Sequence, residues 1–270
     1  MITLFEKDIR TADRQSSKGN QLKWLRKGIW YKADYTGYEG LSEYMISNLL
    51  KKSSLGDKEY VLYQTENIQY GAIRFCGCKS RDFLEEGEEL ITLERLFSNY
   101  YGESLYKSIY KIQDYENRLK FLTEQTERMT GLKQFGAYLC KLLTTDALFL
   151  NEDRHTHNIA VIRNESNQYR YCPIFDNGAA LLSDTTMDYP MGQDVMTLME
   201  NVKAKTFCDS FDEQLDVAEK LYGSHIYFTF GEKEIKNLIE KDTVYPEDVK
   251  RRMLDILMQR IRKYQYLFKK

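Results

Sequence analysis

Long apolar segments are absent from this sequence of 270 residues, and so is a large excess of charge of either sign. No apolar run approaches the roughly 20 residues that a membrane-spanning helix needs. The first residues, MITLFEKDIRTADR, carry acidic and basic side chains too early for a signal peptide. The net charge of −2 argues against a general nucleic-acid-binding protein, because Lys and Arg are not in excess to neutralise phosphates. We therefore expect a soluble cytoplasmic protein that binds neither nucleic acid nor membranes directly.

Cysteine is scarce, and its pattern indicates neither disulfides nor a zinc site. The count of five is odd, and most of these residues lie within apolar helix or strand patterns. Buried free thiols in a reducing cytosol are therefore expected. Zinc is not predicted, because Cys76-x-Cys78 lacks a second pair of ligands at a suitable spacing. The cysteines are Cys76, Cys78, Cys140, Cys172 and Cys208.

A polar loop between two apolar segments carries the most informative motif of the chain. Asp153 precedes Asn158 by five residues, and Asp176 follows in an Asp-x-Gly sequence. This spacing suits a phosphoryl-transfer site, in which an Asp orients and deprotonates a substrate hydroxyl. Asn158 can hold Mg²⁺ from the same loop, and Asp176 can bridge the metal to nucleotide phosphates. We therefore predict Asp153 as the base and Asn158 and Asp176 as metal ligands.

The surroundings of this loop favour a functional interpretation over a simple turn. An isolated Asp-x4-Asn usually indicates a turn in which these side chains bind nearby backbone groups. Here an apolar helix pattern, KQFGAYLCKLLTTDALFL, runs into the loop, and the segment NIAVIR follows it as a strand. A second strand, YRYCPIF, ends at Asp176. The order helix, loop, hairpin and Asp-x-Gly is difficult to obtain from an arbitrary turn.

The pattern of apolar residues changes near residue 90. Before it, we expect short strands around one helix, with turns at Gly56-Asp57 and Glu66-Asn67. After it, the pattern is mainly helical except for a hairpin over residues 158–175. We expect an α+β protein with a small β-rich N-lobe, residues 1–80, and a larger, mainly helical C-lobe, residues 81–270. The predicted helices of the C-lobe cover residues 90–100, 115–129, 133–150, 211–222, 232–241 and 246–268.

The N-lobe offers two candidate contacts for phosphates. The stretch Ser16-Ser17-Lys18-Gly19-Asn20 is small, polar and precedes the first strand, so its backbone N–H groups can bind phosphate. With a single glycine it fits an ordinary surface turn equally well. Lys32 follows Trp30 on one face of a strand, where its ammonium can reach the α- and β-phosphates. The alternative is a solvated strand Lys, which is the commonest setting of this residue type.

The helix after this strand supplies a partner for Lys32. Glu39 and Glu43 are four residues apart and share a helical face with Ile46 and Leu50. A carboxylate on an apolar face requires a cation, and Lys32 is the nearest strand candidate. A strand Lys paired with a helix Glu is the arrangement that positions nucleotide phosphates in kinases. We prefer Glu43 because it lies further inside the helix.

These motifs resemble those of the HipA-like kinases, and most closely the small bacterial members without the extra N-terminal subdomain. The resemblance implies a bilobal protein-kinase-like fold, ATP with Mg²⁺, and transfer of the γ-phosphate to Ser or Thr of a protein. It also implies autophosphorylation, a toxin-type regulatory role and an antitoxin-like partner. In that family the residues matching Asp153, Asn158 with Asp176, and Lys32 act as base, metal ligands and phosphate contact. The residues that carry the resemblance are Tyr38-Glu39-Gly40-Leu41-Ser42-Glu43 with Ser47 and Leu49-Leu50, Cys78-Lys79-Ser80-Arg81-Asp82-Phe83-Leu84, residues 151–158 and Pro173-Ile174-Phe175-Asp176-Asn177-Gly178.

The chain departs from common protein kinases in two respects. It has no glycine-rich loop, and the resemblance implies that Ser16 or Ser17 is the site of a self-inhibiting autophosphorylation. Arg154 follows the predicted base instead of preceding it, so control through an activation-loop phosphate is not expected. The adenine is expected to meet backbone groups of a hinge near Gly77, Cys78 and Ser80. His157, in the Asp153 loop, is a further predicted nucleotide contact.

Three other functions are compatible with parts of the sequence. His155-Thr156-His157 together with Asp153 and Asp176 contains ligand types of a metallohydrolase, although the one remaining histidine, His225, is distant. A small-molecule kinase of the aminoglycoside-phosphotransferase type would use the same motif. A pseudokinase that binds a nucleotide or partner without turnover would fit the thin phosphate loop.

Overall fold

The computed structural model describes residues 1–10 and 21–269, which form two compact units. The first unit comprises Met1–Phe83, Phe175–Asn201 and Tyr227–Lys270, and the second comprises Leu84–Ile174 and Val202–Ile226. Each unit therefore combines segments that are far apart in the sequence. The continuous division into residues 1–80 and 81–270 stays a prediction.

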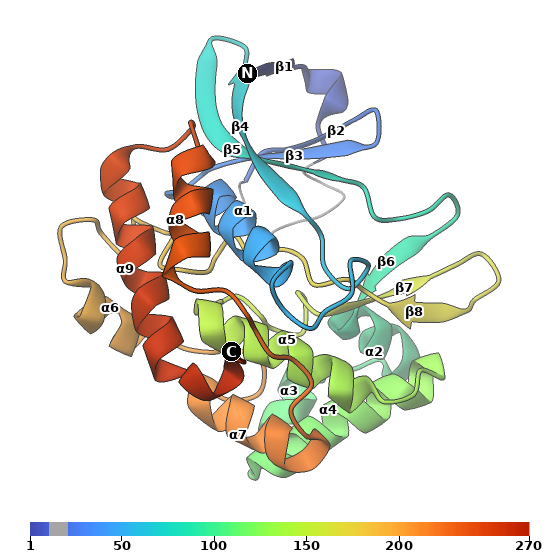
Figure 1. Ribbon diagram of the computed structural model, residues 1–270. Helices are drawn as coiled ribbons and strands as arrows, with labels where there is room; N and C mark the ends of the chain where they lie inside the picture. The colour runs from blue at the N-terminus through green and yellow to red at the C-terminus, as the bar shows by residue number, and fades with distance from the viewer. Residues whose placement is uncertain (11–20, 270) are drawn as a thin grey trace. The chain divides into compact units, whose positions relative to one another are not determined.

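The first unit contains a five-stranded sheet (Figure 1). Its strand order is β1-β4-β5-β3-β2, with β1 parallel to β4 and all other pairs antiparallel. Lys27 and Gly28 both have positive φ and form the tight turn that joins β2 to β3. The strands are β1 (Ile2–Leu4), β2 (Lys23–Arg26), β3 (Ile29–Ala33), β4 (Tyr63–Tyr70) and β5 (Ile73–Arg81).

One face of this sheet is closed by an apolar cluster. Leu4, Trp24, Tyr31, Ala33 and Ile68 are buried together. Because successive side chains of a strand point to opposite faces, Tyr31 and Ala33 face this cluster while Lys32 faces away from it. The alternation in β3 thus places an ammonium group on the face opposite the cluster.

Helix α1 (Glu39–Leu50) packs against β4 and β5. Its buried apolar residues include Leu41, Met45 and Ile46. The Ser47 hydroxyl accepts a hydrogen bond from the Tyr63 N–H at 3.0 Å, which ties the helix to the start of β4. Full burial of a side chain of this size contributes about 1.5–3 kcal/mol, so the apolar face holds α1 in place.

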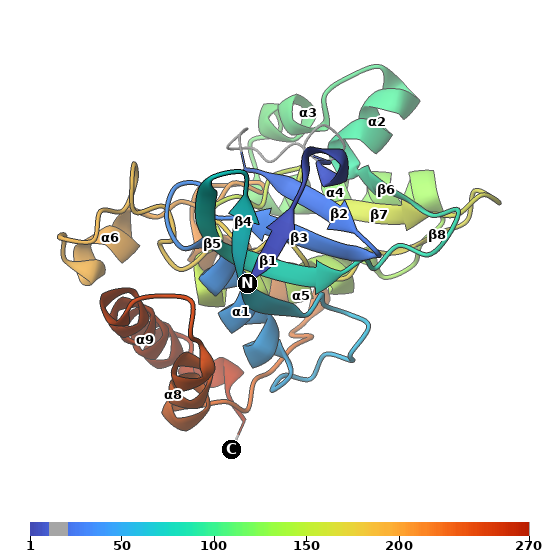
Figure 2. The same cartoon turned by 90° about the horizontal axis from the view of Figure 1, so that it is seen from above.

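The remaining α-helices of the first unit come from the C-terminal half of the chain, whereas the short 3-10 helix η1 lies near the N-terminus. Helices α8 and α9 lie side by side in both views (Figures 1 and 2). The rings of Phe228 and Phe268 pack with centroids 5.5 Å apart and tie the last residues to the segment before α8. The helical elements are η1 (Glu6–Asp8), α6 (Val195–Asn201), α8 (Glu232–Lys241), α9 (Glu247–Lys263) and η2 (Gln265–Leu267).

The second unit is mainly helical. A three-stranded antiparallel sheet, in the order β6-β7-β8, lies beside helices that include α5, which packs on α4 and α7. Ser104, Asp114 and Ser210 each accept a hydrogen bond from a backbone N–H of the first turn of their helix, as N-caps do. The elements are β6 (Glu89–Thr92), α2 (Leu93–Tyr101), α3 (Leu105–Lys111), α4 (Tyr115–Thr130), α5 (Phe135–Phe149), β7 (Ala160–Arg163), β8 (Tyr169–Tyr171) and α7 (Phe211–Tyr222).

The structure corrects two local predictions. Glu66 and Asn67 do not form a turn, because both lie inside β4 and pair with Gly77 and Cys76 of β5; the turn follows at residues 71–72. The predicted helix at residues 90–100 is wrong at its start, because residues 89–92 pair with β7 as strand β6. Helices α3 and α6 were not predicted, since each has only seven residues.

The five cysteines are all free thiols, as predicted, and all are buried except the half-buried Cys76. Among the described residues, no helix combines the length and apolar character needed to cross a membrane.

Candidate functional site

Lys32 stands between two carboxylates of the first unit. Its Nζ atom lies 2.7 Å from Glu43 Oε1 and 2.7 Å from Asp176 Oδ1. The same ammonium lies 5.2 Å from the centre of the Tyr63 ring. One cation thus holds a helix residue and a loop residue that are separated by more than a hundred positions in the sequence. We call Lys32, Glu43 and Asp176 the lysine–carboxylate group.

Glu43, and not Glu39, is the partner of Lys32. Glu43 is 1% exposed, and its second oxygen accepts a hydrogen bond from the Asn177 N–H at 2.9 Å. Glu39 instead accepts hydrogen bonds from the N–H groups of Thr36 and Gly37 at the start of α1. The preference for the Glu further inside the helix is therefore consistent with the contacts.

The charges of this group are set by burial and by mutual attraction. Burial alone would lower the pKa of Lys32, but Asp176 and Glu43 raise it well above its ordinary value, so the ammonium stays protonated. Burial raises the pKa of Glu43, although Lys32 and the Asn177 N–H favour its ionised form. With both carboxylates ionised the group carries a net charge of −1, which attracts a further cation.

Asp176 is held in an unusual backbone conformation. Its φ angle is 58°, in the left-handed region that only Gly, Asn and Asp adopt readily. Its side chain meets Lys32, and the N–H of the next residue, Asn177, binds Glu43. Two contacts to the same ion pair therefore fix this turn. Residues in sparsely populated backbone conformations cluster at functional sites, where the surrounding contacts maintain them.

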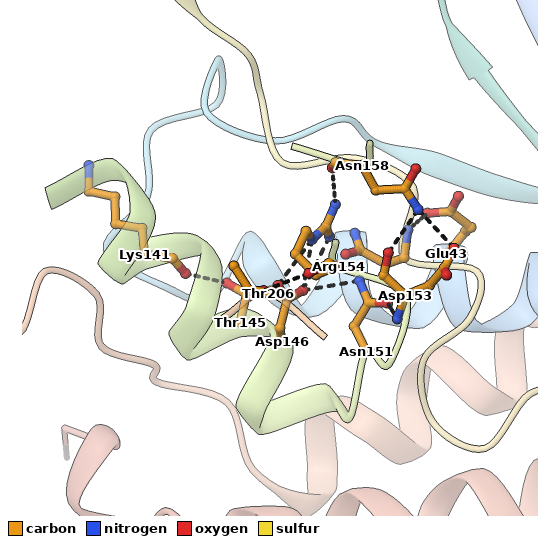
Figure 3. A network of polar contacts seen from close by, with 10 residues as sticks. Glu43, Lys141, Thr145, Asp146, Asn151, Asp153, Arg154, Asn158 and Thr206 are labelled. Atoms are coloured by element: carbon orange, nitrogen blue, oxygen red, sulfur yellow. Dashed lines mark hydrogen bonds and ion pairs between the residues drawn. The ribbon is translucent and has the colours of Figure 1, made fainter. Parts of the chain in front are cut away.

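In the second unit, the loop after α5 brings Asp153 and Asn158 together. Asn158 Nδ2 donates to the carbonyl oxygen and to Oδ2 of Asp153, both at 2.8 Å (Figure 3). With its amide nitrogen used in this way, Asn158 presents its amide oxygen elsewhere. Asp153 is only partly buried, so a substrate hydroxyl can approach it.

A buried ion pair anchors this loop to α5. Arg154 Nε lies 3.0 Å from Asp146 Oδ2, and both side chains are 2% exposed. Arg154 also donates to the carbonyl oxygen of Asn158, while its own carbonyl oxygen accepts from the Thr206 hydroxyl at 2.6 Å (Figure 3). The Asn151 amide completes the network with a hydrogen bond of 3.0 Å to Asp146. The loop is thus fixed before and after Asp153.

Sequence reasoning missed Asp146 and gave Arg154 no structural function. Asp146 sits in an otherwise apolar helix pattern, and a lone carboxylate there needs a cation. The need of this carboxylate for a cation is the feature of the sequence that could have predicted an ion pair here. Burial raises the pKa of Asp146, whereas Arg154 and Asn151 favour its ionised form.

His155 contacts both Asp153 and His157 in the loop. His155 Nε2 lies 3.5 Å from Asp153 Oδ1, and His155 Nδ1 accepts from the His157 N–H at 3.2 Å. This assignment places the proton of the neutral ring on Nε2. The described residues contain no cluster of three or more His, Cys, Asp or Glu side chains arranged for a metal ion.

The donor types present do suit Mg²⁺ with a nucleotide. Mg²⁺ binds oxygen, usually through one or two protein side chains together with substrate phosphates and water. The Asn158 amide oxygen and the Asp176 carboxylate are oxygen donors of this kind. A site of this type needs no cluster of three protein ligands.

Five further residues were predicted to contact the nucleotide: Ser16, Ser17, Lys18, Gly19 and His157. Ser16, Ser17, Lys18 and Gly19 lie outside the described residues. His157 is exposed on the Asp153 loop.

Gly77, Cys78 and Ser80 lie inside β5, not in a connecting hinge. A side chain at Gly77 would approach the Lys32 carbonyl oxygen to 2.1 Å, and one at Gly40 would meet Gly77 at 2.5 Å. The two glycines therefore allow α1 and β3 to pack closely on β5. Their contact with adenine stays a prediction.

Comparison with solved structures finds similarity to the crystal structure of a Helicobacter pylori proinflammatory kinase, CtkA, with a TM-score of 0.61. The alignment covers 97% of this chain and 94% of that chain at 15% sequence identity. No family model and no curated protein sequence matches the chain. At this identity the similarity establishes the fold alone, and it confirms the predicted α+β, kinase-like class.

Proposed function

We propose that the protein is an ATP-dependent kinase that transfers the γ-phosphate to a Ser or Thr hydroxyl of a protein. The observation that carries the proposal is the position of Lys32 Nζ, 2.7 Å from both Glu43 and Asp176. A strand Lys held by a helix Glu, with an Asp at the metal position, is the phosphate-binding arrangement of kinases. The kinase-like fold and the Asp153–Asn158 pair add further support.

In this proposal the lysine–carboxylate group binds the phosphates. Lys32 donates to phosphate oxygens, and the hydrogen bond to Glu43 directs the ammonium. Bound Mg²⁺ would neutralise charge on the β- and γ-phosphates, and Asp176 and Asn158 are the residues that would hold it. Because Lys32 remains protonated, it supplies a fixed positive charge for the anionic transition state.

Asp153 is the proposed base. The hydrogen bond from Asn158 to Oδ2 orients the carboxylate, and the Arg154–Asp146 pair holds the loop from behind. The substrate oxygen attacks the γ-phosphorus, the bond to the β–γ bridging oxygen breaks, and the hydroxyl proton passes to Asp153. Positioned proton transfer of this type contributes roughly a hundredfold to ten-thousandfold in rate.

The remaining assignments belong to the same proposal. Ser16, Ser17, Lys18 and Gly19 contact the phosphates, Gly77, Cys78 and Ser80 contact the adenine, and His157 is a further contact. Autophosphorylation at Ser16 or Ser17 adds roughly two negative charges beside the triphosphate and lowers its affinity. A toxin-type role with an antitoxin-like partner follows from the HipA-like resemblance alone.

Two measurements test the proposal. Calorimetry with ATP, with and without Mg²⁺, should show Mg²⁺-dependent binding. Incubation with γ-labelled ATP and a cell lysate should label protein, and acid hydrolysis should release phosphoserine or phosphothreonine. Absence of binding at millimolar ATP would disprove the proposal, and label only in small molecules would favour the small-molecule kinase.

A further inference from the structure

A groove of about 760 Å³ lies in the second unit, next to the Asp153 loop. Its lining includes His155 from the loop, Tyr106 and Tyr110 from α3, Arg118 from α4, and Lys203 and Lys205 from the segment before α7. We call it the Tyr–Lys groove. Its volume falls within the range of ordinary ligand pockets, about 300–1,000 Å³. The tyrosines and lysines of the Tyr–Lys groove have no role in the phosphoryl transfer proposed above.

The groove is fixed to the loop by buried contacts. Glu94, 7% exposed, accepts from the Thr156 hydroxyl at 2.7 Å and from the Tyr106 N–H at 2.9 Å. One carboxylate thus joins the loop to the start of α3. On the opposite side, Thr206 donates to the Arg154 carbonyl oxygen, which holds the neighbouring Lys205 beside the loop. A molecule bound in the groove would therefore have a defined position relative to Asp153.

The lining is cationic, although the chain as a whole has a net charge of −2. Three cations, Arg118, Lys203 and Lys205, face one carboxylate, Asp209, which leaves two positive charges. Asp209 is bound by Lys203 at 3.2 Å. Lys205 is exposed and has no ion pair with any described residue. A ligand that offers carboxylates would meet unneutralised positive charge here, whereas a polycation such as an aminoglycoside would be repelled.

The arrangement of the aromatic rings favours a peptide over nucleic acid. Arg118 covers the Tyr110 and Tyr115 rings at 4.7 and 5.2 Å, and Tyr106 packs on Tyr110 with centroids 4.6 Å apart. Ring faces that are already covered are poor platforms for base stacking, which single-stranded nucleic-acid sites use. Tyr106 and Tyr110 are still 43% and 36% exposed, so their edges and hydroxyls offer contacts to a peptide.

Arg118 is itself held ready for an anion. Its Nε and Nη1 donate to the carbonyl oxygens of Ile112 and Phe207 at 2.6 and 2.8 Å. These bonds fix the guanidinium plane and leave Nη2 without a hydrogen-bond partner among the residues that the structure describes. A preorganised guanidinium loses less side-chain entropy when it binds a carboxylate.

We propose that the Tyr–Lys groove binds an acidic segment of the protein substrate and so presents the acceptor hydroxyl to Asp153. Presentation of the acceptor hydroxyl rests on the proposed kinase function. Binding of the acidic segment does not, and it can be measured without ATP. It narrows the acceptor to proteins with Asp- or Glu-rich sequence close to the phosphorylated Ser or Thr.

The test uses the full chain and fluorescence anisotropy with two labelled synthetic peptides. Both contain one Ser, flanked by Glu residues in one peptide and by Lys residues in the other. The wild-type protein should bind the Glu peptide more tightly, and added salt should weaken this binding because the contacts are exposed charges. The double variant Lys203→Glu/Lys205→Glu should bind the Glu peptide about twofold to thirtyfold more weakly, from the usual strength of two surface ion pairs.

Two further variants complete the design. Lys205→Glu alone disturbs no ion pair within the described residues, so it replaces the double variant if that variant is unstable. It should also weaken binding of the Glu peptide. Lys51→Glu/Lys58→Glu makes the same change in net charge at exposed positions of the first unit, and should bind the Glu peptide like the wild type. Calorimetry with ATP on the wild-type protein tests the kinase proposal separately.

The outcomes separate clearly. Weaker binding of the Glu peptide in the groove variants, with the control unchanged, supports the inference even if ATP does not bind. Equal affinity for both peptides, tighter binding of the Lys peptide, of kanamycin or of a poly(U) oligonucleotide, or an equal loss in the control pair would overturn it.

Discussion

The ammonium nitrogen of Lys32 lies 2.7 Å from Glu43 Oε1, and this pair joins β3 to the buried face of α1. Asp176 takes the second contact of the same ammonium. Lys32 therefore compensates part of the charge of both carboxylates. The pair serves the fold of the first unit and, in the proposed function, the binding of phosphates.

Replacement of Lys32 by Met should weaken both the stability of the first unit and the binding of phosphates. Loss of one partner from a buried pair costs about 3–5 kcal/mol, because it leaves the other charge uncompensated. We expect a lower free energy of unfolding in urea and loss of Mg²⁺-dependent ATP binding. Lys79→Met is the matched control, since Lys79 is 31% exposed and pairs with Glu66 at 2.9 Å. The control should lose about 1 kcal/mol or less. Equal destabilisation of the two variants would contradict the special position of Lys32.

Asp153→Asn and Asp176→Asn should separate chemistry from nucleotide binding. Loss of the base should lower the rate of phosphoryl transfer roughly a hundredfold to ten-thousandfold, with ATP affinity unchanged. Asp176→Asn removes a charged contact of Lys32 and a proposed metal ligand, so ATP affinity should fall as well. Asp216→Asn, an exposed position on α7, should retain the rate of the wild type. Circular dichroism checks the fold, and near-normal autophosphorylation in either site variant would refute its assigned role.

The Asp146–Arg154 pair should behave as a coupled unit. Asp146→Leu leaves a guanidinium that is 2% exposed without its carboxylate, which should cost about 3–5 kcal/mol of unfolding free energy. The double variant Asp146→Leu/Arg154→Leu should recover part of that loss, because no charge remains buried. Chemical denaturation of the single and double variants gives the coupling energy, expected at about 0.5–3 kcal/mol. Additive losses would show that the two side chains act independently.

The parts of the site that the sequence predicted share a local signature. Asp153 and Asn158 lie in one loop at a fixed spacing, and Glu43 follows from helical periodicity beside Ile46 and Leu50. These relationships need only the geometry of a single element. The five longer C-terminal helices were predicted for the same reason, whereas α3 and α6 are too short to give a periodic signal.

What could not be predicted depends on contacts between distant segments. Lys205 reaches the Asp153 loop because Thr206 bonds to the Arg154 carbonyl oxygen across 52 positions. The sequence of β6 alone fits the start of a helix. Its strand conformation depends on pairing with β7, about 70 residues later in the chain. Gly77 was predicted to lie in a hinge. Its close packing against Lys32 and Gly40 arises only when β5, β3 and α1 are assembled, so the sequence alone does not show it.

Gly77→Ala tests this packing. A methyl group at this position would lie 2.1 Å from the Lys32 carbonyl oxygen, so β3 or β5 must shift. Such overpacking typically costs about 1–3 kcal/mol. Gly192→Ala, where an added methyl group meets nothing within 4 Å, should leave the melting temperature nearly unchanged. If both variants melt like the wild type, the close approach at Gly77 is not required.

The protonation of His155 gives a prediction for pH dependence. Burial lowers the pKa of His155 below its ordinary value of 6.5; Asp153 opposes this effect, while His157, Lys205 and Arg154 reinforce it. The unfolded chain therefore binds a proton more readily than the folded protein as the pH falls below 6.5. The contribution of His155 to stability is complete above that pH and is lost as the pH falls toward its folded-state pKa. His155→Gln should remove this part of the acid dependence, measured as the difference in unfolding free energy between variant and wild type at several pH values.

Nuclear magnetic resonance can follow the same group directly, since the chain has only three histidines to assign. His155 should titrate below 6.5 in the wild type. In Lys205→Glu its pKa should rise, because an anion replaces a cation that disfavours the protonated ring. Lys51→Glu, remote in sequence and part of the first unit, should leave the titration unchanged. A His155 that titrates at or above 6.5, or that does not respond to Lys205→Glu, would show that the electrostatic coupling between the groove and the Asp153 loop is absent.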